Sequence, residues 1–171
     1  MIEKYNSVEF LQRIQKLKLK AVSIPIVIIL FSFGLNFVLQ ISFLKYLSLF
    51  GLAAYIFVSL LFRINKNVSP DTDPNAYYSP LNGKIVTAKN NVVIIEKTLF
   101  QASEIRHPSN NENAKFEIIA GKSYIFESTP TLIGKLIGIV PGSATCKCYI
   151  PENFLVEIRS GQSVIAGETI L

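Results

Sequence analysis

The sequence predicts an N-terminal transmembrane helical hairpin followed by an all-β domain of the barrel-sandwich type. Three observations support this fold class. Residues 21–62 are almost wholly apolar and contain one charged residue, Lys45. Residues 76–171 contain short runs rich in Val, Ile, Tyr and Phe, separated by Gly, Pro and Asn, as is typical of all-β domains. The mean hydropathy of +0.38 is high for a soluble domain and excludes a disordered chain.

Two apolar runs within residues 21–62 are each long enough to cross a membrane. Ala21–Leu44 has 24 residues and Tyr46–Phe62 has 17, whereas a spanning helix needs roughly 20. Two runs without a cleavage signal argue against a signal peptide. We expect two helices that turn at a polar tip and pack through small residues. The tip residues are Gln40, Ser42 and Lys45, and the packing residues are Ser32, Gly34, Gly51, Ala53 and Ala54.

Basic residues flank the two runs and predict their orientation. Five Lys or Arg precede the first run, Arg63 and Lys66 follow the second, and only Lys45 lies at the tip. The positive-inside rule therefore predicts a bacterial-type inner membrane protein with both termini and the β domain in the cytoplasm. Residues 1–20 are expected to form an amphipathic helix in the membrane interface. A solvated helix fits residues 1–20 equally well.

The distribution of charge argues against nucleic acid as a partner. Residues 1–62 carry six basic and two acidic residues, whereas residues 63–171 carry eleven and ten. The excess positive charge belongs to the membrane flank, so membrane phospholipid is the expected partner and no nucleic acid is expected. A homo-oligomer or hetero-oligomer stays open.

The cysteines and the histidine do not indicate a metal site. Cys146 and Cys148 are one residue apart, so on a strand both side chains would lie on one face. We expect two reduced core residues. His107 is the only histidine, and zinc would need further ligands that the sequence does not supply.

Residues 63–75 form the expected linker, and residues 76–171 the expected β domain. Within the latter, the predicted strands are Gly83–Ala88, Asn91–Glu96, Lys115–Ile119, Ser123–Glu127, Leu136–Val140, Thr145–Ile150, Phe154–Ile158 and Ser163–Ile165. Residues 129–138 are compatible with either a short helix or irregular chain. Glycines in Ser79–Val86 and Gly161–Leu171 occur at spacings typical of barrel-sandwich domains, which predicts that these two segments are neighbours.

Four motifs occur in this chain in a fixed order. They are Leu61-Phe62-Arg63 after the second apolar run, Ala76-Tyr77-Tyr78-Ser79-Pro80-Leu81-Asn82-Gly83-Lys84-Ile85-Val86, then Phe100-Gln101-Ala102-Ser103 with Ser109-Asn110-Asn111-Glu112-Asn113, and the closing strands from Pro151 to Leu171. Together they resemble the short, membrane-bound, pyruvoyl-type phosphatidylserine decarboxylase family. The resemblance covers most of residues 15–171 with a gap, and its closing motif is the most specific part.

The resemblance implies a definite chemistry. In that family a serine hydroxyl attacks the carbonyl of the preceding glycine, and the resulting ester undergoes elimination. The chain is cut, and the serine becomes a pyruvoyl group that accepts electrons while phosphatidylserine loses CO₂. An Asp and a His support the serine, as in other triads. The corresponding cleavage pair here is Gly142-Ser143, with Ser143 as the candidate nucleophile and pyruvoyl precursor.

This chain departs from the family pattern at each of the three positions. Asn82 stands where the family has Asp, and an amide cannot accept a proton. The segment between Val86 and Phe100 is too short for the family's histidine hairpin, and His107 falls in a polar segment beyond it. A gapless alignment places Ala144, rather than Ser143, at the serine position, so Gly142-Ser143 also fits an ordinary turn.

These departures favour a non-catalytic, decarboxylase-like membrane protein that binds phospholipid headgroups or a partner. An active decarboxylase that self-cleaves at Gly142-Ser143 and forms phosphatidylethanolamine is the alternative. In the first case no cofactor is expected, and in the second the only one is the pyruvoyl group from Ser143. A carrier domain with Lys147 as its modified lysine, and a pure anchor without ligand, also stay open.

Overall fold

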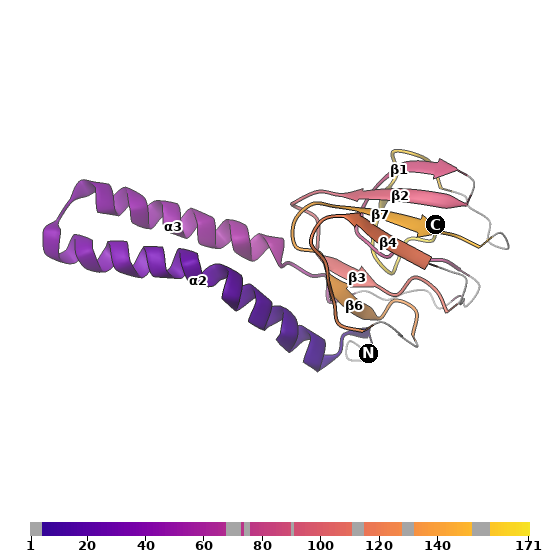
Figure 1. Cartoon of the computed structure of the whole chain (residues 1–171), viewed down its shortest axis with the longest axis horizontal. Helices are drawn as coiled ribbons and strands as arrows, with labels where there is room; N and C mark the ends of the chain where they lie inside the picture. Colours follow the sequence, from indigo (N-terminus) through magenta and orange to yellow (C-terminus); the bar gives the residue numbers. More distant parts are fainter. Residues whose placement is uncertain are drawn as a thin grey trace.

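A helical hairpin projects from one end of a β domain in this computed structural model (Figure 1). The structure describes residues 5–67, 73, 76–89, 91–110, 115–127, 132–151 and 158–171. The hairpin consists of α2 (Val8–Leu39, 32 residues) and α3 (Ser42–Leu61, 20 residues). Both are long and apolar enough to cross a membrane, and most of their apolar side chains are exposed. The expected order of a hairpin followed by β structure is therefore confirmed.

The turn of the hairpin lies at the expected polar tip. Gln40 adopts a left-handed conformation with φ of 52°, and its N–H donates to the Asn36 carbonyl, which ends α2. Ser42 already begins α3, so Lys45 lies in the second helix rather than between the helices. The first span therefore ends at Leu39, five residues earlier than the apolar run suggested.

Small residues bring the two helices together. The Ser32 and Ser48 hydroxyls are 2.8 Å apart. Gly51 is buried, and a Cβ built on it would lie 2.9 Å from Ile29 Cγ1. The predictions for Ser32 and Gly51 are thus confirmed. The prediction for Gly34 is wrong, because a Cβ there would have no neighbour within 4 Å. Two residues along a helix correspond to about 200° of rotation, so Gly34 cannot share the face of Ser32.

Residues 8–20 are the first part of α2, not a separate helix. Phe10 and Ile14 are buried against Leu136 and Ile139 of the β domain. The apolar face that was expected to enter the membrane interface is therefore covered by protein over these positions. The apolar positions of residues 8–20 indicated that one face is covered, but such a pattern cannot distinguish lipid from protein as the covering surface.

Two antiparallel sheets make up the β domain. The larger has the order β4-β7-β2-β1-β8 and the smaller β3-β6-β5, and neither closes into a barrel among the described residues. The strands are β1 (Gly83–Lys89), β2 (Val92–Lys97), β3 (Glu104–Arg106), β4 (Lys115–Ala120), β5 (Tyr124–Ile125), β6 (Leu136–Ile139), β7 (Ala144–Tyr149) and β8 (Ser163–Val164). The all-β prediction is confirmed.

Most predicted strands match the observed ones to within a few residues, with two differences. β3 was not expected, because Glu104 and Arg106 are charged, yet both are fully buried. The segment Ser123–Glu127 forms only the short strand β5. The prediction for Phe154–Ile158 falls almost entirely outside the described residues. Residues 132–135, part of the undecided stretch, contain no helix or strand.

The first and last segments of the β domain are neighbours, as predicted. β1 pairs with β8 through Gly83 and Val164. Beyond this pair, the Leu171 N–H donates to the Tyr77 carbonyl at 2.8 Å, and the Gly167 N–H donates to the Ser79 carbonyl at 2.8 Å. The closing segment thus completes the sheet edge next to the opening segment.

Cys146 and Cys148 are buried on one face of β7, as expected from their spacing. Their sulfur atoms are 3.8 Å apart, and both thiols are reduced. They belong to the main core together with Val93 and Ile95. Burial raises the pKa of the Cys148 thiol well above its ordinary value, and the neighbouring Cys146 adds to the effect. These thiols are therefore packing residues.

Candidate functional site

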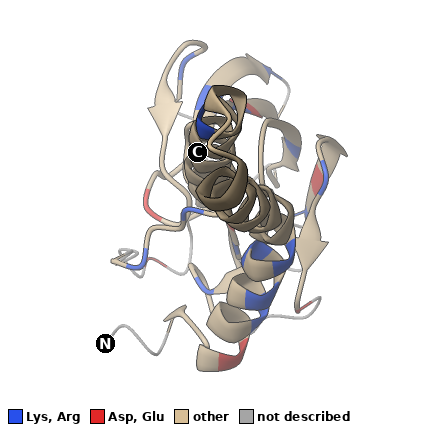
Figure 2. Ribbon diagram, turned by 90° about the vertical axis from the view of Figure 1, so that its left-hand side faces the viewer, with Lys and Arg blue, Asp and Glu red and all other residues tan. Residues whose placement is uncertain are grey.

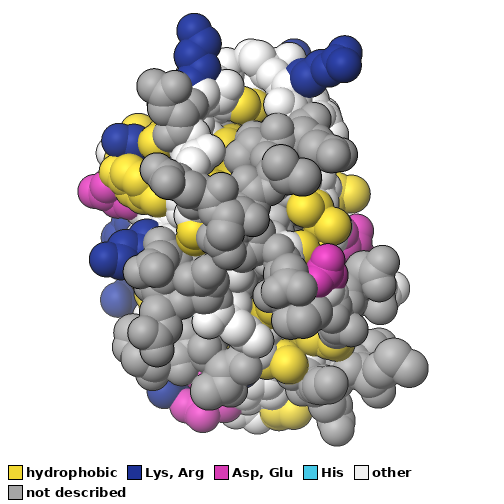
Figure 3. All heavy atoms as spheres, turned by 90° about the vertical axis from the view of Figure 1, so that its right-hand side faces the viewer, with side chains coloured by type: hydrophobic (Ala, Val, Ile, Leu, Met, Phe, Trp, Pro, Cys, Tyr) yellow, Lys and Arg dark blue, Asp and Glu magenta, His cyan; other side chains and the backbone are white. Residues whose placement is uncertain are grey.

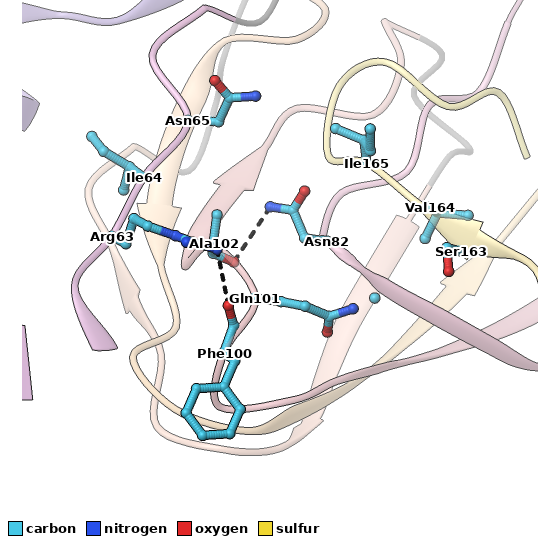
Figure 4. Close-up of a pocket in the computed structure, with 11 residues that line it drawn as sticks. Arg63, Ile64, Asn65, Asn82, Phe100, Gln101, Ala102, Ser163, Val164 and Ile165 are labelled. Carbon is cyan, nitrogen blue, oxygen red and sulfur yellow. Dashed lines mark hydrogen bonds between the residues drawn. The ribbon is translucent and has the colours of Figure 1, made fainter. Parts of the chain in front are cut away.

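A cavity of about 530 Å³ lies at the end of the β domain from which the hairpin projects (Figure 4). Four segments build it: the chain after α3, the start of β1, the loop between β2 and β3, and the segment around β8. The lining residues are Arg63, Ile64, Asn65, Asn82, Gly83, Phe100, Gln101, Ala102, Ser163, Val164 and Ile165. The opposite end of the domain, seen in Figure 3, shows hydrophobic and charged side chains interspersed among its described residues.

Hydrogen bonds join the loop between β2 and β3 to the end of α3. The Arg63 guanidinium donates from Nη2 to the Phe100 carbonyl at 2.9 Å. The Ser103 N–H donates to the Arg63 carbonyl at 2.7 Å, and the Ser103 hydroxyl donates to the Leu61 carbonyl. Phe100 itself is 71% exposed. An exposed aromatic ring and a guanidinium group thus lie together where the apolar helix ends.

Asn82, which the resemblance compares with the decarboxylase Asp, is buried and makes three hydrogen bonds. Its Nδ2 donates to Glu104 Oε1 at 2.8 Å and to the Ala102 carbonyl at 3.3 Å. Its Oδ1 accepts from the Ala166 N–H at 3.2 Å. The side chain therefore connects the opening segment, β3 and the closing segment. Because its amide is fully engaged, Asn82 has a structural role at this site.

Glu104 places a carboxylate next to Asn82, whose own side chain is an amide. It is fully buried, and besides Asn82 it accepts the Asn65 N–H at 3.1 Å through Oε2. Sequence reasoning missed this residue. No sequence signal indicated it, because a short strand with two charges gives no clear hydrophobic pattern.

Lys97 is the second buried charge that sequence reasoning missed. It is 2% exposed, and its Nζ donates to the Gly142 carbonyl at 2.5 Å and to the Thr98 carbonyl at 3.3 Å. Burial lowers its pKa to about 8, against the opposing effect of Glu104, while Arg63 lowers it further. Its position is in phase with Val93 and Ile95, the inward-facing residues of β2. Strand alternation was therefore a usable signal.

Gly142 and Ser143 form the turn that leads into β7. Gly142 is buried with φ of +96°, a conformation that favours glycine. Ser143 is exposed, and its hydroxyl makes no hydrogen bond to a described residue. The structure thus brings the Gly142 carbonyl to Lys97, but brings no described carboxylate or imidazole into hydrogen-bond contact with Ser143.

His107 lies away from this pair. Its N–H donates to the Lys135 carbonyl at 2.9 Å. Lys135 precedes β6, whereas Gly142 follows it, so the strand separates the histidine from Ser143. Burial lowers the pKa of His107, and the Lys135 charge acts in the same direction against Glu127. His107 follows β3 in a segment without helix or strand, as expected for a loop histidine.

The two cysteines do not join these groups. Among the described residues, no three His, Cys, Asp or Glu side chains come together as a metal site would require. Lys147, the residue of the carrier alternative, lies within β7 with its Nζ 4.8 Å from the centre of the Tyr149 ring. A carrier lysine normally sits at the tip of a hairpin, so the interior of a strand does not suit that role.

Comparison with known proteins yields no relative. No protein-family description, curated protein or solved structure matches this chain significantly. The function is therefore argued from the site itself.

Proposed function

We propose that this protein is a membrane-anchored, phosphatidylserine decarboxylase-like protein without catalytic activity, whose β domain binds a phospholipid headgroup. The hairpin spans a bacterial-type inner membrane with both termini and the β domain in the cytoplasm. The two exposed apolar helices and the basic residues on their flanks support this placement. The pairing of the opening and closing segments supports a barrel-sandwich relationship for the β domain.

The position and lining of the cavity carry this proposal. It opens beside Arg63, two residues beyond the end of α3, where headgroups lie if the helix spans the bilayer. A guanidinium group is suited to a phosphate because it can donate two parallel hydrogen bonds. Asn65 and Gln101 add amide groups to the lining, and Phe100 offers an apolar surface next to the lipid. These groups recognise an anionic headgroup with polar substituents.

The surroundings of Asn82, His107 and Ser143, the residues compared above with the family's Asp, His and Ser, support the absence of catalysis. The Asn82 amide is occupied by three partners, and His107 lies beyond β6. The exposed Ser143 hydroxyl has no hydrogen-bonded base among the described residues. A hydroxyl without a base is a weak nucleophile at neutral pH.

Binding of a short-chain lipid to the detergent-solubilised full chain tests the proposal. Dihexanoyl phosphatidylserine should bind more tightly than dihexanoyl phosphatidylcholine in native mass spectrometry. Arg63→Gln should weaken binding about tenfold, since a charged hydrogen bond contributes about 1.5–3 kcal/mol. Lys89→Gln, which removes the same charge at the far end of β1, is the matched control. Equal affinities for wild type and Arg63→Gln would contradict the headgroup site.

The contact between Lys97 and Gly142 favours a second candidate, an active decarboxylase that processes itself at Gly142-Ser143. The Ser143 hydroxyl would add to the Gly142 carbonyl carbon, the C–N bond would break, and the hydroxyl proton would end on the released amine. The Lys97 ammonium is hydrogen-bonded to the oxygen on which negative charge develops. Loss of the α-proton of residue 143 would then expel the Gly142 carboxylate. Hydrolysis of the dehydroalanine would leave a pyruvoyl group and ammonia.

Intact mass distinguishes the two candidates. Self-processing would produce a fragment of residues 1–142 and a blocked fragment from residue 143 onward. Lys97→Met should then stop cleavage, whereas Lys84→Met, an exposed lysine of β1, should not. A single full-length chain after prolonged incubation would exclude the second candidate and agree with the first.

A further inference from the structure

A second cavity, of about 500 Å³, lies between the two helices near the β domain. Its lining changes character along α2. Leu19, Val22 and Ile26 of α2 and Tyr55 of α3 line the part toward the hairpin tip. The part toward the β domain contains the polar residues of the lining, Gln15, Lys18 and Lys66, together with Leu11, Ile14 and Ile64. Figure 2, viewed from the side of the hairpin, shows Lys and Arg gathered along the first half of α2. The groove is thus apolar toward the hairpin tip, and both of its lysines lie toward the β domain, at what we call its basic end.

The groove follows from how the helices pack. They approach closely at Gly51, where a Cβ would clash with Ile29. Pro25 lies inside α2, and a proline there removes a backbone hydrogen bond and bends the helix. Figure 1 shows α2 bending near its middle and leading away from α3. The space between the diverging helices is the groove.

The basic end of the groove falls at the level of the headgroups. Lys18 precedes Leu39, the end of α2, by 21 residues, which corresponds to about 32 Å of helix. The hydrocarbon core of a bilayer is about 30 Å thick. If the hairpin tip lies at one surface, Lys18 lies at the other. Lys66 follows the end of α3 by five residues and reaches the same level.

The two lysines are available to an anion. Neither the Lys18 nor the Lys66 amine has an ion pair or a hydrogen bond within the described part of the chain. Lys16 and Lys20, which flank Lys18 in the sequence, are exposed and do not line the groove. Two cations facing one apolar groove complement a molecule that carries a phosphate above a hydrocarbon chain.

We infer that this groove holds one anionic glycerophospholipid, with its phosphate between Lys18 and Lys66 and an acyl chain along Val22, Ile26 and Tyr55. About eight residues separate Lys18 from Ile26, so roughly 12 Å of acyl chain contacts the groove. The lipid fills the space below the bend of α2. This site lies across Ile64 from the headgroup cavity, and it depends only on the helices spanning a bilayer.

A tryptophan placed in the groove reports the lipid directly, because the chain contains no tryptophan. Leu19→Trp introduces the reporter into the groove, and Phe31→Trp places a control on an exposed helix face. Both proteins are reconstituted in phosphatidylcholine vesicles with a small fraction of brominated phosphatidylglycerol or brominated phosphatidylcholine. Brominated chains quench only a nearby indole, so quenching measures which lipid occupies the site.

The expected result is a preference for phosphatidylglycerol at Leu19→Trp and none at Phe31→Trp. Adding Lys18→Gln and Lys66→Gln should lower that preference about tenfold or more, since a direct hydrogen bond from a charged group to the phosphate contributes roughly tenfold in affinity. Adding Lys16→Gln and Lys20→Gln instead removes the same charge and should leave most of the preference. Circular dichroism checks that every variant retains its helices.

Three results would overturn the inference. Equal loss with both lysine pairs would show diffuse attraction to the basic flank. Equal quenching by both lipids would show ordinary bilayer contact. Absence of quenching by either lipid would show that protein covers the groove. Because none of these variants alters Arg63, the binding of short-chain phosphatidylserine to the headgroup cavity is tested separately.

Discussion

The Lys97 ammonium group donates a hydrogen bond of 2.5 Å to the carbonyl oxygen of Gly142. The two residues are 45 positions apart, and β2 and β7, which are hydrogen-bonded neighbours, bring them together. Lys97 is the last residue of β2, and Gly142 lies two residues before Ala144, the first residue of β7. A buried cation therefore holds the turn before Ser143, whether or not that turn is ever cleaved.

Lys97 should make stability depend on pH. Its pKa is about 8 in the folded protein, below the ordinary value of 10.5 in an unfolded chain. Between these values the unfolded chain binds more protons, so stability should rise with pH from about 8. We expect wild type to gain about 1–3 kcal/mol relative to Lys97→Met between pH 7.5 and 10. Chemical denaturation of both proteins at several pH values measures the difference.

The comparison with Lys97→Met cancels the contributions of other groups. Burial raises the pKa values of Tyr77 and Cys148 in both proteins alike, so their contribution cancels. Parallel pH profiles for the two proteins would show that Lys97 keeps its ordinary pKa.

Replacing Asn82 by Asp should destabilise the domain. Asn82→Asp would place a second carboxylate 2.8 Å from the buried Glu104, and two carboxylates at that distance cannot both stay ionised. The pKa of the pair would rise, so stability should fall as pH increases from 5 to 8. Asn82→Ala should instead cost about 1–3 kcal/mol with a flat profile over that range. Thermal melting at three pH values compares the variants, and a flat profile for Asn82→Asp would disagree.

The end of the closing segment offers a matched pair of substitutions. Leu171 is 2% exposed and its neighbour Ile170 is 48% exposed. Leu171→Ala should cost about 2–4 kcal/mol, because it leaves a cavity in the core. Ile170→Ala should cost less than about 1 kcal/mol. Denaturant titrations of the two variants check the values, and similar losses would show that the closing segment is not packed as described.

A second matched pair tests the hairpin. Gly51→Leu would force its Cβ against Ile29, whereas the Cβ of Gly34→Leu would have no neighbouring atom within 4 Å. We expect Gly51→Leu to separate the helices and lower the melting temperature in detergent by several degrees. Gly34→Leu should leave it almost unchanged. Equal effects would mean that the helices meet through another face.

The sequence predicts the order of the elements well because the signals are local. The apolar runs locate both helices, and short β-branched runs locate most strands. The pairing of the opening and closing segments also follows from their glycine spacing. The contact of Phe10 with Leu136 does not, because an amphipathic face indicates burial without naming the partner.

The sequence alone indicated only some of the residues of the candidate site. Asn82, Gly142 and Ser143 could be found through the resemblance. Glu104 and Lys97 could not, because charged residues are normally assigned to the surface. Their burial depends on partners 22 and 45 positions away, namely Asn82 and Gly142. Such pairs become apparent only when the register of the sheets is known.

The β domain is attached to both helices of the hairpin. Phe10 and Ile14 fix it to α2, and the bond from Ser103 to Leu61 fixes it to α3. A single tether would let the domain rotate, but two attachments hold one side of it toward the hairpin. If the hairpin spans a bilayer and the domain binds a lipid, as proposed, the lipid would reach the domain by lateral diffusion in two dimensions without leaving its leaflet. Its local concentration would be that of the membrane rather than that of the surrounding solution, so even weak affinity would suffice for occupancy.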